Sequence, residues 1–156
     1  VSELSKKDIL SRVAEVDVVY KTLVAPEDRV KVTSSTDVVG VLRAVWDEGT
    51  IELHEEFKVI LLNRANQVLG VRHLSRGGVA GTVADPKLIF QAAIKANCSS
   101  IILAHNHPSS SLNPSDADIR LTKKVKKAAE LLEIELLDHI ILTATDHYSF
   151  ADNGDL

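Results

Sequence analysis

Two histidines and one aspartate have the types and spacing that bind a metal ion. Seven residues separate His107 from the Ser-x-x-Asp sequence that ends at Asp118, and His105 lies two residues before His107. Because side chains at i and i+2 of an extended segment point the same way, both imidazoles can face one ion. A catalytic zinc binds three such protein ligands and keeps an open position for water. The pattern therefore predicts a Zn²⁺ site formed by His105, His107 and Asp118.

A hydrolase built on such a site also needs a carboxylate that moves protons. Glu55 and Glu56 directly precede the apolar run 57–62. They lie on opposite faces of an extended chain, so only one of them can face the metal. Lys58 makes the face of Glu56 slightly more polar, which favours Glu55 only weakly, and the residues alone leave the choice between the two open.

Ser115 has two possible roles. Its hydroxyl is placed to donate to the oxyanion of a tetrahedral intermediate, as donors do in other acyl-transfer sites. Ser115-x-x-Asp118 is also a capping box, which would make both residues ordinary parts of a helix N-terminus. Each feature alone favours the ordinary interpretation, and only the combination of His-x-His and Ser-x-x-Asp after a buried strand is specific for a metal site.

The single cysteine, Cys98, excludes an internal disulfide and a cysteine-rich zinc site. A structural zinc prefers four protein ligands, so a fourth ligand from His139 or Cys98 would favour that interpretation. We interpret His139 as a core histidine, or one that supports a ligand. A nucleobase deaminase needs His-x-Glu and Pro-Cys-x-x-Cys, and a zincin needs His-Glu-x-x-His; neither pattern is present. The chain also lacks the Gly-x-Ser-x-Gly elbow of a serine hydrolase.

The composition is that of one globular domain. The chain has 156 residues, of which 45% are hydrophobic and 26% charged, with a net charge of -4. A cationic nucleic-acid binder is not expected from that balance. The N-terminus has no apolar signal core, and no apolar run approaches the roughly 20 residues that span a bilayer. We therefore expect a soluble, cytoplasmic protein with no membrane partner.

Alternating strands and helices are predicted to position these residues. Residues 16–24 and 29–33 indicate weak strands, and a short helix is expected after Ser5 and Asp8. A helix is predicted from Ser35–Asp37 to Gly49, then a hairpin of 57–62 with 68–74, and a helix from Asp85-Pro86. Residues 99–104 form a buried strand, and residues 105–113 a loop. Pro114 opens a long helix, followed by strands at 134–142 and 148–151. This order predicts an α/β fold with a mixed sheet, in which residues 1–35 form an N-terminal extension that packs on a core of residues 36–156.

A stripe of positive charge lies on one face of the long helix, at Arg120, Lys123, Lys124 and Lys127. Such a stripe can contact phosphates, which makes a nucleic-acid-binding module the alternative to an enzyme. A solvated outer helix face is the ordinary interpretation of the same residues.

The five candidate residues Glu55, His105, His107, Ser115 and Asp118 resemble, in order and spacing, the JAMM (MPN-plus) metalloprotease motif. The runs 104–109, 114–118, 137–141 and 148–150 are closely similar to the RadC family, and the similarity covers roughly residues 36–151. In RadC proteins a Glu stands two residues before an aromatic, and this match to Phe57 is the main reason for choosing Glu55.

The resemblance implies a cytidine-deaminase-like α/β/α sandwich. It also implies a zinc-dependent peptidase or isopeptidase, in which Glu55 shuttles protons and Ser115 steadies the oxyanion. RadC proteins carry a DNA-repair label, and short RadC-like chains resemble products of mobile elements, so a nucleic-acid-associated module with little hydrolase activity is the alternative. The sequence departs from the family at Ser110, where glycine is usual, and the N-terminal segment lacks a helix-hairpin-helix-like region.

Overall fold

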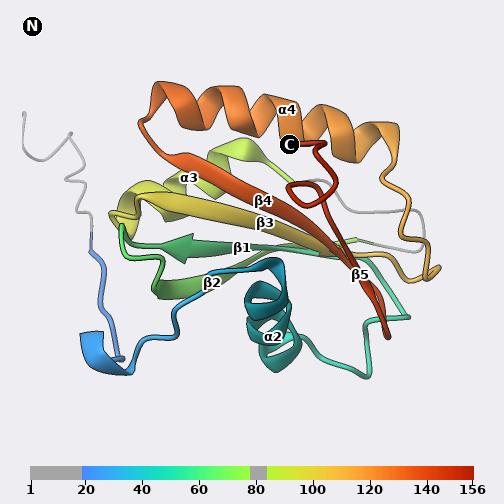
Figure 1. The fold of residues 1–156 in the computed structure, drawn as a ribbon, viewed down its shortest axis with the longest axis horizontal. Helices are drawn as coiled ribbons and strands as arrows, with labels where there is room; N and C mark the ends of the chain where they lie inside the picture. Colours follow the sequence, from blue (N-terminus) through green and yellow to red (C-terminus); the bar gives the residue numbers. More distant parts are fainter. Residues whose placement is uncertain (1–18, 78–83) are drawn as a thin grey trace, which may run out of the picture.

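A computed structural model of the chain describes residues 19–77 and 84–156. These residues form a five-stranded sheet in the order β2-β1-β3-β4-β5 (Figure 1). The strands are β1 (Glu56–Leu62), β2 (Val68–Arg76), β3 (Ser100–Asn106), β4 (Glu135–Leu142) and β5 (His147–Ser149). β3 and β4 are parallel, and the other neighbouring pairs are antiparallel. The predicted mixed sheet and the predicted hairpin of β1 with β2 are therefore confirmed.

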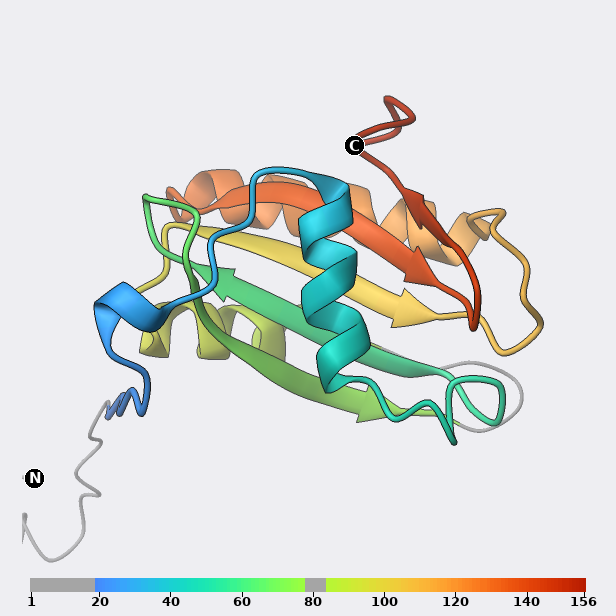
Figure 2. The ribbon, with the colours of Figure 1, turned by 60° about the horizontal axis from the view of Figure 1, so that its bottom comes forward.

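Helices cover both faces of the sheet, as Figure 2 shows. α2 (Ser35–Val45) packs on one face, and α3 (Pro86–Lys95) and α4 (Asp116–Leu131) pack on the other. Successive strand residues alternate between two cores: Val59 contributes to the core under α3 and α4, and Ile60 to the core under α2. β1 and β3 are buried along their whole length because both faces are covered. The arrangement is the predicted three-layer α/β/α sandwich.

Each of the helices α2, α3 and α4 begins after a side chain that accepts a hydrogen bond from a backbone N–H group of the first turn. Ser34 and Ser115 form capping boxes with Asp37 and Asp118, and Asp85 accepts a bond from the backbone N–H of Lys87. The N-terminus of α4 is therefore fixed at Ser115, and Asp118 lies in its first turn.

Several local predictions differ from the structure. Residues 19–24 and 29–33 are not strands, and only Lys31 makes an isolated bridge, to Gln67. A short 3₁₀ helix, η1 (Pro26–Asp28), interrupts this segment, and β-rich composition without a long partner does not make a strand. The helix expected after Ser5 lies outside the described residues.

Three element boundaries also move. The segment 105–113 is not all loop, because His105 and Asn106 extend β3 by pairing with β4. α4 begins after Ser115, so Pro114 precedes the helix and does not open it. α2 ends at Val45 and not near Gly49, because the chain is already extended at Trp46. Among the described residues, no helix combines the length and apolar character needed to cross a bilayer.

Candidate metal centre

Three segments meet at one edge of the sheet. β3 ends at Asn106, α4 begins at Asp116, and β1 begins at Glu56 beside the end of β3, because β1 and β3 are antiparallel (Figure 2). The backbone N–H of His107 donates to the carbonyl of Leu142, which continues the β3–β4 ladder one residue beyond the strand. His105 and His107 therefore keep an extended backbone and point to the same side.

The three predicted ligands converge. The Nε2 atoms of His105 and His107 are 3.0 Å apart, and Asp118 Oδ1 is 3.2 Å from His105 Nε2. Asp118 Oδ2 is 3.6 Å from His107 Nε2. Ligand atoms about 2.0–2.1 Å from a tetrahedral zinc are about 3.3 Å from each other. The three side chains therefore form one group that could hold a metal ion, and its spacing and donor types fit zinc.

The three side chains differ in their exposure to solvent. The side chain of His105 is fully buried, whereas those of His107 and Asp118 are 14% and 13% exposed. An ion held by the three residues would therefore be reached from solvent past His107 and Asp118. The described residues contribute these three candidate ligands to the group and no fourth. Cys98 lies before the opposite end of β3, so it is not a ligand here.

Hydrogen bonds at the first turn of α4 leave one oxygen of Asp118 free for a cation. Asp118 Oδ2 accepts bonds from the backbone N–H and the hydroxyl of Ser115, at 2.7 and 2.6 Å. Oδ1 then faces His105. Burial raises the pKa of Asp118, but the neighbouring imidazoles of His105 and His107 lower it more, so the net pKa is well below the usual range. Asp118 is therefore a carboxylate at neutral pH.

Ser115 is seen in its capping role. Its hydroxyl donates to Asp118 Oδ2 and accepts from the backbone N–H of Asp118, and its side chain is exposed. The oxyanion role stays a prediction, since it requires the hydroxyl to turn from the carboxylate to a substrate.

The loop from β3 to α4 orients His107. The Nδ1 atom of His107 lies 2.8 Å from the carbonyl of Ser111, which can only accept, so Nδ1 carries a proton. The nearby carboxylate of Asp118 raises the pKa of His107, and the charge of Glu55 adds to that effect. Ser110 has a φ of 60°, in the left-handed region that favours glycine, which gives a physical reason for the glycine usual at this position in the family that the sequence resembles.

Glu55 and Glu56 lie in different surroundings. Glu56 is buried and pairs with Lys58 at 2.6 Å and with Arg76 at 2.8 Å. Burial raises its pKa, but the bonds from Lys58, Arg76 and His54 lower it to about 2. Glu55 is half-buried and close enough to His107 for its charge to raise the pKa of that imidazole. This arrangement is the one that the choice of Glu55 as general base requires, and its catalytic role stays a prediction.

Asn106 is a residue that sequence reasoning missed. Its fully buried side chain accepts a bond from the backbone N–H of Glu56 at 2.7 Å and donates to the carbonyls of Ile51 and His54, at 2.6 and 2.9 Å. Asn106 therefore ties the end of β3, where both histidines lie, to the segment that carries Glu55. Its place between the two histidines was the one signal that could have drawn attention to it.

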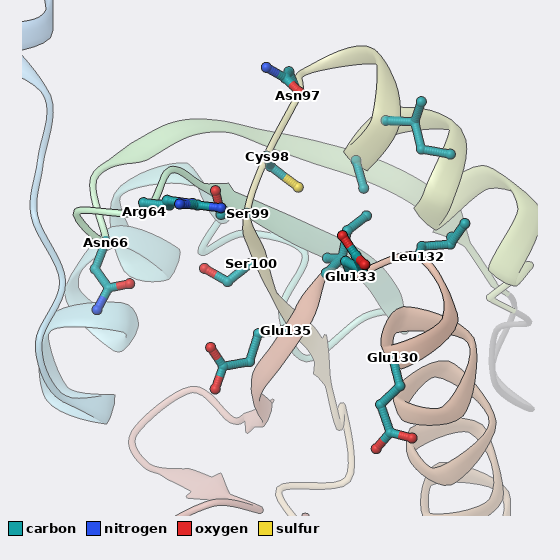
Figure 3. A pocket seen from close by; sticks show the side chains of 13 residues that line it. Arg64, Asn66, Asn97, Cys98, Ser99, Ser100, Glu130, Leu132, Glu133 and Glu135 are labelled. Carbon is teal, nitrogen blue, oxygen red and sulfur yellow. The ribbon is translucent and has the colours of Figure 1, made fainter.

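Two other features lie away from the site. The four basic residues of the α4 stripe are all exposed (Arg120, Lys123, Lys124 and Lys127). A cavity of about 790 Å³ lies at the opposite end of β3, where Ser100 and Glu135 are found, and Figure 3 shows its lining, which includes Arg64 and Glu130. None of the three metal-binding candidates contributes to it.

Comparison with known proteins gives consistent matches. The family profile described as RadC-like JAB domain matches residues 32–155. A UPF0758 protein of Flavobacterium johnsoniae is 45% identical over 124 residues, which cover 80% of this chain and 53% of that protein. A UPF0758 protein of Porphyromonas gingivalis is 50% identical over 101 residues, covering 64% and 44%. A third, of Clostridium beijerinckii, is 36% identical over 135 residues, covering 86% and 58%. The chain thus spans about half the length of the curated relatives it matches.

Proposed function

The chain belongs to the RadC-like JAB domain family, and from that premise we propose that it is a zinc-dependent hydrolase of the JAMM type, which cleaves an amide bond in a peptide or isopeptide. The observation that carries this proposal is the convergence of His105, His107 and Asp118 at the end of β3. Two imidazole nitrogens and one carboxylate oxygen are a ligand set of catalytic zinc sites.

The proposal assigns zinc binding to His105 Nε2, His107 Nε2 and Asp118 Oδ1. When bound, zinc supplies a Lewis acid and lowers the pKa of water to about 7. A structural zinc prefers a fourth protein ligand, and the described residues offer none. The partial exposure of His107 and Asp118 leaves a route for water and substrate. These two features favour a catalytic over a structural ion.

Glu55 is the proposed general base. Its carboxylate takes a proton from the attacking water and later gives it to the nitrogen of the leaving amine. Glu56 is unsuited to this task, because its carboxylate is already bonded to Lys58, Arg76 and His54 and its pKa is about 2. A carboxylate held in such a network is only weakly basic.

Ser115 is proposed to have two roles, one before the substrate binds and one during the reaction. In the resting state its backbone N–H and hydroxyl hold Asp118 Oδ2, which directs Oδ1 toward the histidines. When a substrate is bound, the exposed hydroxyl turns to donate to the developing oxyanion. The first role concerns the arrangement of a ligand, and the second concerns the rate of reaction.

Metal content tests the first part of the proposal. The purified protein, dialysed against dilute zinc and then against buffer, should retain about one zinc per chain by mass spectrometry of the metal. His107→Ala should lose it. His147→Ala is the matched control, because His147 is a partly exposed histidine outside the group. Zinc retained in full by His107→Ala contradicts the ligand assignment.

Catalysis needs a separate measurement. A peptide library that contains ordinary and lysine-ε-linked amide bonds is incubated with the zinc-loaded protein, and cleavage is detected by mass spectrometry. Glu55→Gln should keep its zinc and lose any cleavage that the wild type shows. An equal loss caused by Glu56→Gln alone, in a protein that still folds, shows that the wrong face of the strand was chosen.

A further inference from the structure

A chain of hydrogen bonds connects two of the proposed metal ligands through residues that are not ligands themselves. It begins at the backbone carbonyl of Asp118, passes through the Thr122 hydroxyl to His139, and ends at His105. We infer that Thr122 and His139 are positioning residues, which fix the tautomer of His105 so that an unprotonated Nε2 faces the metal. This inference rests on the proposed function, because it takes His105 as a ligand.

Thr122 sets the direction of the chain. Its Oγ1 is 2.7 Å from the carbonyl oxygen of Asp118, and a carbonyl oxygen can only accept. The single hydroxyl proton therefore lies between these two oxygens. Oγ1 is also 2.6 Å from His139 Nδ1, and with its own proton already in use it must accept there. His139 consequently carries a proton on Nδ1.

His139 carries one proton and not two. It is completely buried between aromatic rings, and its ring stacks on Phe150 with centroids 4.8 Å apart. Among the residues that the structure describes, no carboxylate is hydrogen-bonded to its ring, and a buried charge without a partner is unfavourable. The Nε2 atom of a neutral His139 protonated on Nδ1 is an acceptor.

The same logic then fixes His105. Its Nδ1 lies 2.9 Å from His139 Nε2, and since that atom accepts, His105 Nδ1 must donate. In a neutral His105 the lone pair therefore lies on Nε2, which is the atom directed at His107 and Asp118. Reversal of the chain would place a hydrogen on Nε2, and that hydrogen must be removed before a metal binds.

Surrounding side chains hold the two rings in place. Phe57 lies parallel to His105, with centroids 5.7 Å apart and an angle of 3°. The buried carboxylate of Asp138 accepts bonds from the backbone N–H of His139 and from Ser149, and so attaches β4 to β5. The runs 137–141 and 148–150, which took no part in the proposed chemistry, thus acquire a function as the support of His105.

The carbonyl at the start of the chain belongs to Asp118, which is itself a proposed ligand. The first turn of α4 therefore does two things: it supplies a carboxylate and, through Thr122, it sets the proton order of a histidine on β3. Residues that orient a ligand in this way typically change metal affinity about 10- to 100-fold when they are replaced.

The first test is spectroscopic and needs no metal. In protein labelled with ¹⁵N-histidine and freed of metal, long-range ¹H–¹⁵N spectra report which ring nitrogen carries the proton. His139 should be protonated on Nδ1 and unprotonated on Nε2. A proton on His139 Nε2 overturns the inference, whether or not the protein binds zinc.

The second test measures zinc affinity by competition with a chelator. Thr122→Val keeps the shape but removes the hydroxyl, and it should bind zinc at least about ten-fold more weakly than the wild type. Thr122→Ser should restore affinity to within about two-fold of the wild type. Thr143→Val is the control, because Thr143 is an equally buried threonine whose hydroxyl bonds the carbonyl of Asp146 instead.

The outcomes separate the two proposals. If the wild type binds zinc and Thr122→Val binds it equally well, the inference fails and the proposed metal site stands. If the wild type binds no zinc, the proposed function fails, and the spectroscopic result alone decides the proton order. A Thr122→Val protein that does not fold likewise leaves the decision to the wild-type spectra.

Discussion

Replacement of Asn106 by alanine gives a prediction that links stability to the arrangement of the site. The side chain makes three hydrogen bonds to backbone groups of residues 51–56, and Asn106 is fully buried. Asn106→Ala leaves one N–H and two carbonyls without their partner. A buried polar group left without its partner costs about 1–3 kcal/mol. The costs of neighbouring groups do not add fully, so we expect Asn106→Ala to lower the free energy of unfolding by about 3–5 kcal/mol, which is less than the sum of three separate costs.

The effect should be confined to one side of the site. His105 on β3 and His107 just after it remain in place, because β3 pairs with β1 and β4, whereas residues 51–56 lose the bonds that hold them to β3. We therefore expect Asn106→Ala to keep about one zinc per chain and to lose the activity that depends on Glu55. Amide hydrogen exchange in residues 51–56 should accelerate more than exchange in β4.

Urea denaturation and hydrogen exchange measure these two effects. Asn113→Ala is the control, because Asn113 is exposed, and its free energy of unfolding should change by less than about 0.5 kcal/mol. The reasoning is refuted by a loss below about 1 kcal/mol in Asn106→Ala, or by exchange in residues 51–56 that equals that of the wild type.

Four shorter predictions follow. The fold stabilises the ionised form of Glu56, so its contribution to stability is complete above pH about 4.5 and is lost as the pH falls toward its folded pKa of about 2. The difference in unfolding free energy between wild type and Glu56→Gln should therefore shrink over that pH range. A difference that does not change with pH in urea titrations contradicts this prediction. Ser115→Ala should cost about 1 kcal/mol through the lost cap, and an unchanged kcat in the zinc-loaded variant would exclude the oxyanion role. Lys123→Glu combined with Lys124→Glu should weaken any complex with duplex DNA at low salt, and a wild type that forms no complex ends the nucleic-acid alternative. Removal of zinc by a chelator should leave the circular dichroism spectrum unchanged, because two hydrophobic cores hold the fold; unfolding would show a structural ion.

The sequence was sufficient to predict which elements meet and which three side chains converge. His105 and His107 follow a run of apolar residues that only a buried strand explains, and Ser115 and Asp118 have the spacing of a helix N-terminus. Strand, loop and helix in that order return the chain to the same edge of the sheet. The convergence of ligands is therefore a consequence of local patterns, which are the part of a fold that sequence periodicity reports.

Contacts between residues far apart in the sequence could not be predicted from these local patterns. The choice between Glu55 and Glu56 depends on Arg76, which lies twenty residues away from Glu56 and bonds its carboxylate. The roles of Asn106 and Thr122 depend on backbone carbonyls, which carry no signal in the sequence. Weak strands were expected at 16–24 and 29–33, and the described residues 19–24 and 29–33 do not form them, because a strand requires a partner and composition does not reveal one.

The hydrogen bonds of the site share a common feature that bears on how it works. The side chain of Asn106 on β3 bonds the segment of Glu55, and the hydroxyl of Thr122 on α4 reaches His105 through His139. Ser115 fixes the carboxylate of Asp118 within the first turn of α4. Because most of these partners are backbone groups or buried rings, the side chains are ordered before any ion or substrate arrives. Little conformational entropy then remains to be lost on binding, and zinc affinity should depend on the proton order of the histidines more than on folding of the site.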